Sequence, residues 1–378
     1  MQKHFILTPG PTMVPPSVLA AGAKPVVHHR SPDYEPLFMK VSEDLKYVFQ
    51  TKNPVLTFAS SGTGAMEAAV VSTLSPGDTA ITVEGGKFGE RWTELCKAFG
   101  IKSVVLKIEW GSAATADQIK KALQENPDTK AVFVTHCETS TGVLTDIRAI
   151  AKVVNTTNAI VVVDAVSSLG AEEIRTDDWG IDIVVTGSQK ALMMPPGLAF
   201  LSISEKAQKM VESSTCPKYY FSVAKYLKNL GKKTTPFTPA VSMTMALEEA
   251  LEIIKAEGIE QVWARHKRLA SATRAGVKAL GLDIFANPTS NVVTAVKVPE
   301  SIDAGKIVKT LRDVHGITIA GGQEQLKGKI FRVATLGYAD TFDVTTVLAA
   351  LEMTLVKLGI KIELGQGVKA ALEILKEI

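Results

Sequence analysis

Short apolar runs, rich in β-branched residues, recur through the first two-thirds of the chain. Most of them are apolar at consecutive positions, which is typical of strands that are covered on both faces. Between them lie stretches with the apolar spacing of surface helices. This alternation predicts a doubly wound α/β domain with a mainly parallel sheet. The expected strands span residues 80–83, 103–106, 131–135, 159–163, 183–186 and 198–202, and the expected helices span residues 88–99, 117–124 and 147–154.

The pattern changes near residue 234, where prolines mark a loop. Beyond it, long helical patterns are followed by strand-like runs and further helices, which predicts a second, smaller α+β domain. We therefore expect an N-terminal arm over residues 1–15, a large α/β domain over 16–255 and a small C-terminal domain over 256–378. The helices expected in this part span residues 242–255, 259–280, 304–315, 343–358 and 367–377, and the strands span 292–298, 317–319 and 330–333.

Composition narrows the class of protein. The chain has 378 residues, of which 46% are hydrophobic and 21% charged, so it can bury a sizeable core. Its net charge is only +3, and we expect no nucleic-acid partner. No apolar stretch reaches the ~18 residues of a membrane span, and the N-terminus does not resemble a signal peptide. We therefore expect no membrane partner and a cytoplasmic location.

The three cysteines are too far apart along the chain to form a zinc pair or a disulfide framework. They are Cys96, Cys137 and Cys216. We expect them to be reduced thiols, and we predict no metal site.

A glycine-containing loop is the first sign of chemistry. Ser61, Gly62, Thr63 and Gly64 follow an apolar run and precede a helical pattern. A helix that begins in such a loop directs free backbone N–H groups and the positive end of its dipole outward, which suits a phosphate. An ordinary helix start without a ligand fits the loop equally well. The loop is neither a Walker motif nor the glycine pattern of dinucleotide-binding proteins.

Two charged residues extend this hypothesis. Asp164 ends a buried apolar run, and the carboxyl end of a parallel strand faces the crevice where α/β proteins bind ligands. Lys190 follows the next strand in a stretch without other charges, where burial lowers the pKa of an amine. Either residue alone could be a surface charge. Together with a phosphate loop, they are the groups that hold pyridoxal phosphate.

The chain as a whole resembles the class V aminotransferases, a group of fold-type I enzymes that depend on pyridoxal phosphate. The resemblance is strongest to alanine–glyoxylate and serine–glyoxylate (or serine–pyruvate) aminotransferases. It implies an α/β fold with a mainly parallel, seven-stranded sheet in the large domain. The matching motifs occur in the family's order at residues 8–16, 29–34, 61–65, 86–91, 136–142, 164–168, 187–196, 235–239 and 331–332.

The resemblance also implies a role for each matching residue. Lys190 forms the aldimine with pyridoxal 5'-phosphate and moves the substrate's proton, and Asp164 pairs with the pyridine nitrogen. A planar, permanently charged group suits a substrate carboxylate, and Arg332 takes this role with the backbone N–H of Gly10. The remaining cofactor contacts are Gly62, Thr63, Gly64 and Gln189 on the phosphate, Phe88 and Val166 on the two ring faces, Thr139 near the ring hydroxyl, and Thr235 and Thr238 on the phosphate of a second subunit.

The expected function is a ping-pong transamination in a homodimer with shared active sites. The donor is a small amino acid, alanine or serine, and the acceptor is a 2-oxo acid, glyoxylate or pyruvate. Three alternatives remain. A cysteine desulfurase would use Cys137 but would have a histidine at Phe88, and an aminoethylphosphonate transaminase would have more arginines near Arg332. A non-catalytic subunit of a soluble hydrogenase would be free to lose Lys190.

Overall fold

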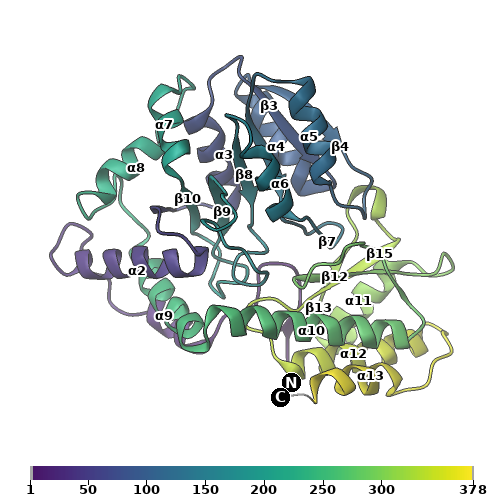
Figure 1. Ribbon diagram of the computed structural model, residues 1–378. Helices are drawn as coiled ribbons and strands as arrows, with labels where there is room; N and C mark the ends of the chain where they lie inside the picture. Colours follow the sequence, from purple (N-terminus) through teal and green to yellow (C-terminus); the bar gives the residue numbers. More distant parts are fainter. Residues whose placement is uncertain (1–2, 377–378) are drawn as a thin grey trace.

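The computed structural model describes residues 3–376 and contains two main sheets with their helices (Figure 1). The larger sheet has seven strands in the order β2-β10-β9-β8-β5-β3-β4. Only β10 runs against its neighbours, so the expectation of a mainly parallel, seven-stranded sheet is confirmed. Its strands are β2 (Val55–Phe58), β3 (Thr79–Glu84), β4 (Lys102–Lys107), β5 (Thr129–Thr135), β8 (Ile160–Asp164), β9 (Ile183–Gly187) and β10 (Ala199–Ile203).

Strands β8, β9 and β10 are buried at every position, as their mainly apolar sequences predict. Helices cover both faces of the sheet (Figure 1). A small hairpin, β6 (Cys137–Glu138) with β7 (Val143–Leu144), follows β5 at the edge where the parallel strands end. The helices of this part are α1 (Pro16–Gly22), α2 (Tyr34–Phe49), α3 (Gly62–Thr73), α4 (Lys87–Ala98), α5 (Ala116–Glu125), α6 (Ile147–Val154), α7 (Glu205–Ser213) and α8 (Val223–Leu230).

The smaller sheet is antiparallel, with the order β11-β12-β15-β14. The long helices α9 and α10 lead from the larger sheet to it (Figure 1). The elements are α9 (Val241–Glu257), α10 (Ile259–Ala279), β11 (Asp283–Ile284), β12 (Val293–Lys297), α11 (Ala304–His315), β13 (Ile317–Thr318), β14 (Ala320–Gly321), the 3₁₀ turn η1 (Glu324–Leu326), β15 (Ile330–Ala334), α12 (Thr341–Lys357) and α13 (Gln366–Leu375).

The start of the chain is bound to the smaller sheet region. β1 (Phe5–Ile6) pairs in parallel with β13, and the Leu7 carbonyl accepts a hydrogen bond from the N–H of Ala334. These backbone bonds anchor residues 5–7, so the chain that follows them is carried across toward the edge of the larger sheet.

The expected domain limits remain a prediction. The division between residues 255 and 256 falls inside α9, which ends at Glu257 just before the break at Gly258. Residues 1–2 of the arm and the last expected helical residue, Glu377, lie outside the described residues. Within residues 3–376, no helix combines the length and hydropathy needed to cross a membrane.

Candidate active site

Lys190 lies just beyond the end of β9, and the N-terminal arm passes directly over it. Its Nζ donates a hydrogen bond to the Pro9 carbonyl at 2.5 Å, and Thr12 Oγ1 donates to the Lys190 carbonyl at 3.0 Å. Gly10 has a positive φ of 110°, and a Cβ on it would lie 2.4 Å from Nζ. Burial lowers the pKa of the Lys190 amine to about 8. The arm and the lysine are therefore in close contact, and the predicted role of the Gly10 N–H toward a substrate remains a prediction.

Asp164 is the last residue of β8, and its side chain is only 4% exposed. Oδ1 accepts a hydrogen bond from the Val166 N–H at 2.8 Å, and Oδ2 has no partner among residues 3–376. Burial raises the pKa of this carboxyl to about 6, although the positive charges of Arg91 and Lys190 oppose the rise. A buried carboxylate with a free oxygen suits a cationic ligand.

The glycine loop forms the N-terminus of α3. Ser61 precedes the helix without capping it through its side chain, so the first N–H groups are not satisfied by that hydroxyl. A Cβ on Gly62 would lie 2.6 Å from Val166, and one on Gly64 would lie 2.5 Å from Ser60 Oγ. A side chain at either position would therefore collide with its neighbours, and the helix start keeps the close backbone approach that a phosphate needs.

Gln189 lies beside this loop and has a buried oxygen without a partner. Its Oε1 accepts no hydrogen bond from the described part of the chain. A Cβ on Gly187 would lie 3.1 Å from that oxygen and 3.4 Å from the backbone nitrogen of Gly62. This unpartnered acceptor can receive a hydrogen bond from a bound group or a water, and the N–H groups at the start of α3 suit the phosphate of a cofactor.

Phe88 is held in place by a buried carboxylate at the start of α4. Glu138 Oε2 accepts hydrogen bonds from the N–H groups of Phe88 at 3.1 Å and Gly89 at 2.9 Å. The Arg91 guanidinium lies 5.1 Å from the centre of the Phe88 ring and donates to Thr63 Oγ1 at 3.2 Å. Arg91 thus connects the aromatic ring to the glycine loop.

Arg332 comes from β15 of the smaller sheet and is 5% exposed. Nε and Nη2 donate to the Gly321 carbonyl at 2.9 and 2.7 Å, and Nη1 donates to the Thr139 carbonyl at 2.8 Å. One N–H on each terminal nitrogen has no acceptor among the described residues, which leaves a forked pair for a carboxylate. Thr139 Oγ1 itself donates to Ser167 Oγ at 2.9 Å.

Three of the expected residues, Lys190, Asp164 and Arg332, lie close enough for their charges to interact. The charges of Asp164, Arg332 and Arg91 all act on the Lys190 amine. Thr235 and Thr238 are not part of this group. They line a small hollow with Tyr34, and Thr235 Oγ1 donates to the Phe237 carbonyl at 2.8 Å. Their predicted role concerns a second subunit and remains a prediction.

Arg91, Glu138 and the Pro9 carbonyl were not predicted as part of the site. Residues 86–91 and 136–142 carried a signal, because both segments belong to the motifs that resemble the class V aminotransferases. Their contacts depend on two segments meeting across the sheet edge, and this cannot be inferred from either segment alone.

Comparison with known proteins agrees with this geometry. Residues 4–337 match the family model described as aminotransferase class-V. A protein of Synechococcus sp. (strain PCC 6716), described as the small subunit of a soluble hydrogenase, is 43% identical over 99% of this chain and 98% of its own length. The L-aspartate–glyoxylate aminotransferase of Paracoccus denitrificans is 38% identical, covering 98% and 96%, and the serine–glyoxylate aminotransferase of Hyphomicrobium methylovorum is 37% identical, covering 97% and 93%.

A solved structure extends the comparison to three dimensions. The crystal structure of ureidoglycine–glyoxylate aminotransferase from Bacillus subtilis superposes with a TM-score of 0.95 at 32% identity, and covers 100% of this chain and 99% of its own. The two folds therefore agree over the whole chain, including the edge of the larger sheet that carries Asp164 and Lys190.

Proposed function

The chain belongs to the class V aminotransferases and is therefore an aminotransferase, and from this premise we propose that it binds pyridoxal 5'-phosphate at Lys190. We further propose that it transfers the amino group of alanine or serine to glyoxylate or pyruvate. The observation that carries the proposal is the buried pair of Lys190 and Asp164 next to a glycine loop that no side chain caps. When bound, the cofactor withdraws electrons from the substrate's α-carbon.

The cofactor would contact four groups of residues. Asp164 Oδ2 would face its pyridine nitrogen, and the Gly62–Gly64 backbone with Gln189 would hold its phosphate. Gln189 Oε1 accepts hydrogen bonds only, so it would receive one from a protonated oxygen or from a water between them. Phe88 and Val166 would pack against the ring faces, and Thr139 would lie near the ring hydroxyl. The fixed positions of Phe88 and Val166 support this arrangement.

Lys190 is the group that moves the proton. Its lowered pKa increases the neutral fraction at pH 7 to 8 compared with an ordinary lysine, and a neutral amine can remove a proton from the α-carbon and return it on the other side of the reaction. The arm would exclude water here, because Pro9 and Gly10 already touch Nζ. Substrate binding requires the Pro9 contact to open.

Arg332 would hold the substrate's α-carboxylate with its two remaining N–H groups. Exchange of Arg332 for lysine keeps the charge but loses the fork, and it also loses two of the three backbone contacts that orient the side chain. We expect the KM for the amino donor to rise more than about tenfold, with a smaller change in kcat. Steady-state kinetics would measure this, and the exposed Arg312→Lys substitution is the control. An unchanged KM would contradict the role assigned to Arg332.

Thr235 and Thr238 would bind the phosphate of the neighbouring subunit in a homodimer. Arg30 Nη1 donates to the Thr235 carbonyl at 2.9 Å, which fixes the loop that carries both threonines. Neither threonine bonds Lys190, Asp164 or the glycine loop within the described residues, which supports a role in a second active site. The assembly would then have two active sites, each built from both chains.

A small donor is proposed because the arginines near Lys190 are already engaged. Arg332 is assigned to the α-carboxylate, and Arg91 is bound to Thr63 and the Phe88 ring. A donor with a second carboxylate would need one of these contacts to break. The aspartate donor in the name of one relative makes this the test that matters most.

The experiment is a panel of single half-reactions with the purified protein. Protein loaded with pyridoxal phosphate is mixed with alanine, serine or aspartate, and the released 2-oxo acid is quantified. We expect alanine or serine to react at least about tenfold faster than aspartate, because the second carboxylate would be buried without a partner. A preference for aspartate would overturn the small-donor proposal but not the transamination. Failure to retain any cofactor after gel filtration would overturn both.

The other functions on this fold are less well supported. Cys137 is 2% exposed, and burial raises the pKa of its thiol to about 12, which does not suit a desulfurase nucleophile. A purely structural hydrogenase subunit would not need the buried charges of Lys190 and Asp164. Cofactor retention in the panel above distinguishes this alternative as well.

A further inference from the structure

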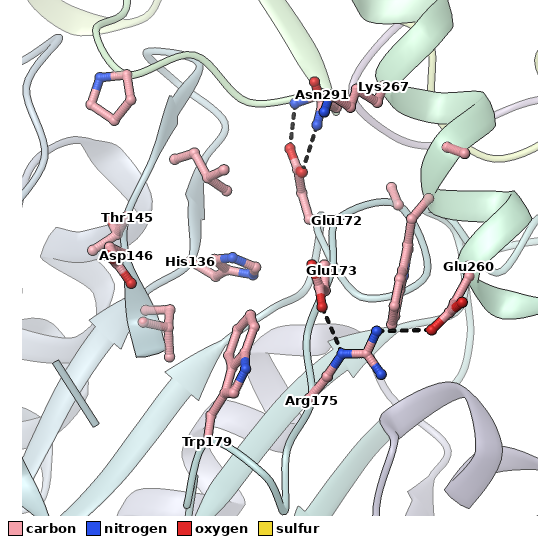
Figure 2. Close-up of a pocket in the computed structure, with 16 residues that line it drawn as sticks. His136, Thr145, Asp146, Glu172, Glu173, Arg175, Trp179, Glu260, Lys267 and Asn291 are labelled. Atoms are coloured by element: carbon pink, nitrogen blue, oxygen red, sulfur yellow. Dashed lines mark hydrogen bonds and ion pairs between the residues drawn. The ribbon is translucent and has the colours of Figure 1, made fainter. Parts of the chain in front are cut away.

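A hollow of the described chain lies outside the predicted site. Its volume is about 680 Å³, within the range of small-molecule sites, and none of its lining residues is among the predicted site residues. It lies between the end of β5, the segment that follows β8, and helix α10 (Figure 2). Both halves of the molecule therefore contribute to its walls.

Two tryptophans line this cavity, and one of them already carries a cation. The Arg175 guanidinium lies 5.3 Å from the ring of Trp263, with ion pairs of 2.6 Å to Glu173 and 2.9 Å to Glu260. Trp179 lines the cavity as well, and within residues 3–376 no cation lies over its ring. The aromatic wall thus has one occupied and one open position for a positive charge.

His136 is the buried polar group of the cavity floor. It is 3% exposed, and its Nδ1 lies 3.1 Å from Ser168 Oγ. Nε2 has no hydrogen-bond partner among the described residues, and the ring points into the cavity (Figure 2). Burial lowers the pKa of this imidazole to about 4, so the ring is neutral at pH 7. In the tautomer that donates the Nδ1 proton to Ser168, Nε2 offers a lone pair.

The charges of the lining favour a cation over an anion. Three lining carboxylates, Asp146, Glu173 and Glu260, face the cations Arg175 and Lys267. Burial raises the pKa of a fourth carboxyl, Glu172, to about 7, so it is only partly charged at pH 7. Asp146 caps α6 with Oδ1, has no ion pair within the described chain, and its charge acts on His136. Figure 2 places Asp146, His136 and Trp179 on the same side of the cavity.

We propose that this cavity is a second small-molecule site, separate from the catalytic one, for a protonated amine that carries a flat apolar group. The ammonium N–H is donated to Nε2 of His136, the positive charge faces Asp146, and the apolar group packs against Trp179. The ammonium of the ligand displaces no side chain, because Arg175 keeps its contacts with the Trp263 ring and with its two carboxylate partners.

The position of the site connects it to both halves of the molecule and to the catalytic edge. Glu172 accepts hydrogen bonds from the N–H and the side-chain amide of Asn291, the latter at 2.9 Å, and Arg175 reaches Glu260 on α10. His136 is bonded to Ser168, four residues beyond Asp164, and its own N–H donates to the Asp164 carbonyl at 2.9 Å. An occupant would therefore bridge the two halves directly behind Asp164.

The probe is N,N-dimethyl-2-phenylethylamine, titrated by calorimetry into the protein carrying its cofactor. This tertiary amine is protonated at pH 7.5 and cannot condense with an aldehyde, so it cannot react at Lys190. We expect it to bind at least about tenfold more tightly than 3-phenylpropionate, which has a similar body and the opposite charge. We also expect the quaternary trimethyl analogue, which lacks the N–H, to bind several-fold more weakly.

Matched variants locate the binding. Trp179→Ala is expected to weaken binding at least about fivefold, whereas Trp110→Ala, outside the cavity, leaves it unchanged. Asp146→Asn keeps the helix cap and is expected to weaken binding about two- to fivefold, with Asp178→Asn as the control. Lys190→Ala should bind the probe as tightly as the parent protein. No detectable binding, equal binding of the anion, or full affinity in a folded Trp179→Ala protein would each overturn the proposal.

Discussion

Replacement of Lys190 by alanine is expected to lower kcat by about three orders of magnitude or more, with little change in the fold. The Lys190 amine is buried, and among residues 3–376 its Nζ bonds only the Pro9 carbonyl of the arm, so its removal takes no hydrogen bond from a helix or strand. Its loss would remove the group that we propose holds the cofactor and moves the substrate's proton. Steady-state rates with alanine or serine and glyoxylate would measure the effect.

Two controls separate the loss of the base from a general defect. Lys152→Ala removes an exposed lysine from α6 and should retain full activity. Addition of a small primary amine such as methylamine should restore part of the rate of Lys190→Ala, because a free amine can occupy the vacated space and accept the proton. A variant that keeps more than about a tenth of the parental kcat would refute the role of Lys190.

Much of the fold could be predicted because the buried strands of the larger sheet have nearly continuous apolar sequences. β8 and β9 are apolar at nearly every position, and only a strand covered on both faces can be so. The residues that end or follow such strands meet at one edge of the sheet, which is why Asp164 and Lys190 could be placed in one site. The apolar spacing typical of a surface helix likewise predicted α6 at its observed limits.

The elements near the N-terminus were harder to predict, and α1 and α2 were missed. Pro15, Pro16, Pro32 and Pro36 interrupt this part of the sequence. Proline is unfavourable within a helix but is tolerated in its first turn, and both Pro16 and Pro36 occupy that position. The prolines therefore stand at helix starts, although proline is otherwise a residue that breaks helices.

The parts of the site that depend on distant segments could not be read from the chain. The bond from Lys190 to Pro9 joins residues that are far apart in sequence, and it exists because β1 pairs with β13 and carries the arm across. The bonds of Glu138 to the first turn of α4 depend in the same way on the hairpin that follows β5. The local sequence pattern does not show which distant segments come into contact.

Replacement of Asp164 by asparagine is expected to lower kcat by about two orders of magnitude or more. The amide has the shape of the carboxyl and can still accept the Val166 N–H through its oxygen, so the β8 end should keep its geometry. What it lacks is the negative charge that would hold a protonated pyridine nitrogen, and a buried charge pair is strong where water is excluded. Single-turnover rates with alanine or serine would show the loss in the proton-transfer step.

The stability of the cofactor-free protein provides an independent test of the same charge. Burial raises the pKa of Asp164 to about 6, above its value in an unfolded chain, so ionisation favours the unfolded state and the folded protein loses stability as the pH rises above about 4. Removal of the charge should therefore leave the cofactor-free Asp164→Asn protein as stable as the parent at pH 8, or more stable, while its activity collapses. Thermal unfolding at pH 5 and pH 8 would measure this.

Asp182 offers a matched control, because it is a buried carboxylate that is already satisfied. It accepts hydrogen bonds from the Val161 N–H at 3.0 Å and Ser204 Oγ at 2.6 Å, and it lies 3.7 Å from the Lys206 ammonium. Asp182→Asn should therefore lower the melting temperature and leave the kcat of the folded protein nearly unchanged. Asp164→Asn should do the opposite. If Asp164→Asn instead destabilised the cofactor-free protein and kept its activity, the carboxylate would be structural, and the pairing with a cationic cofactor would be wrong.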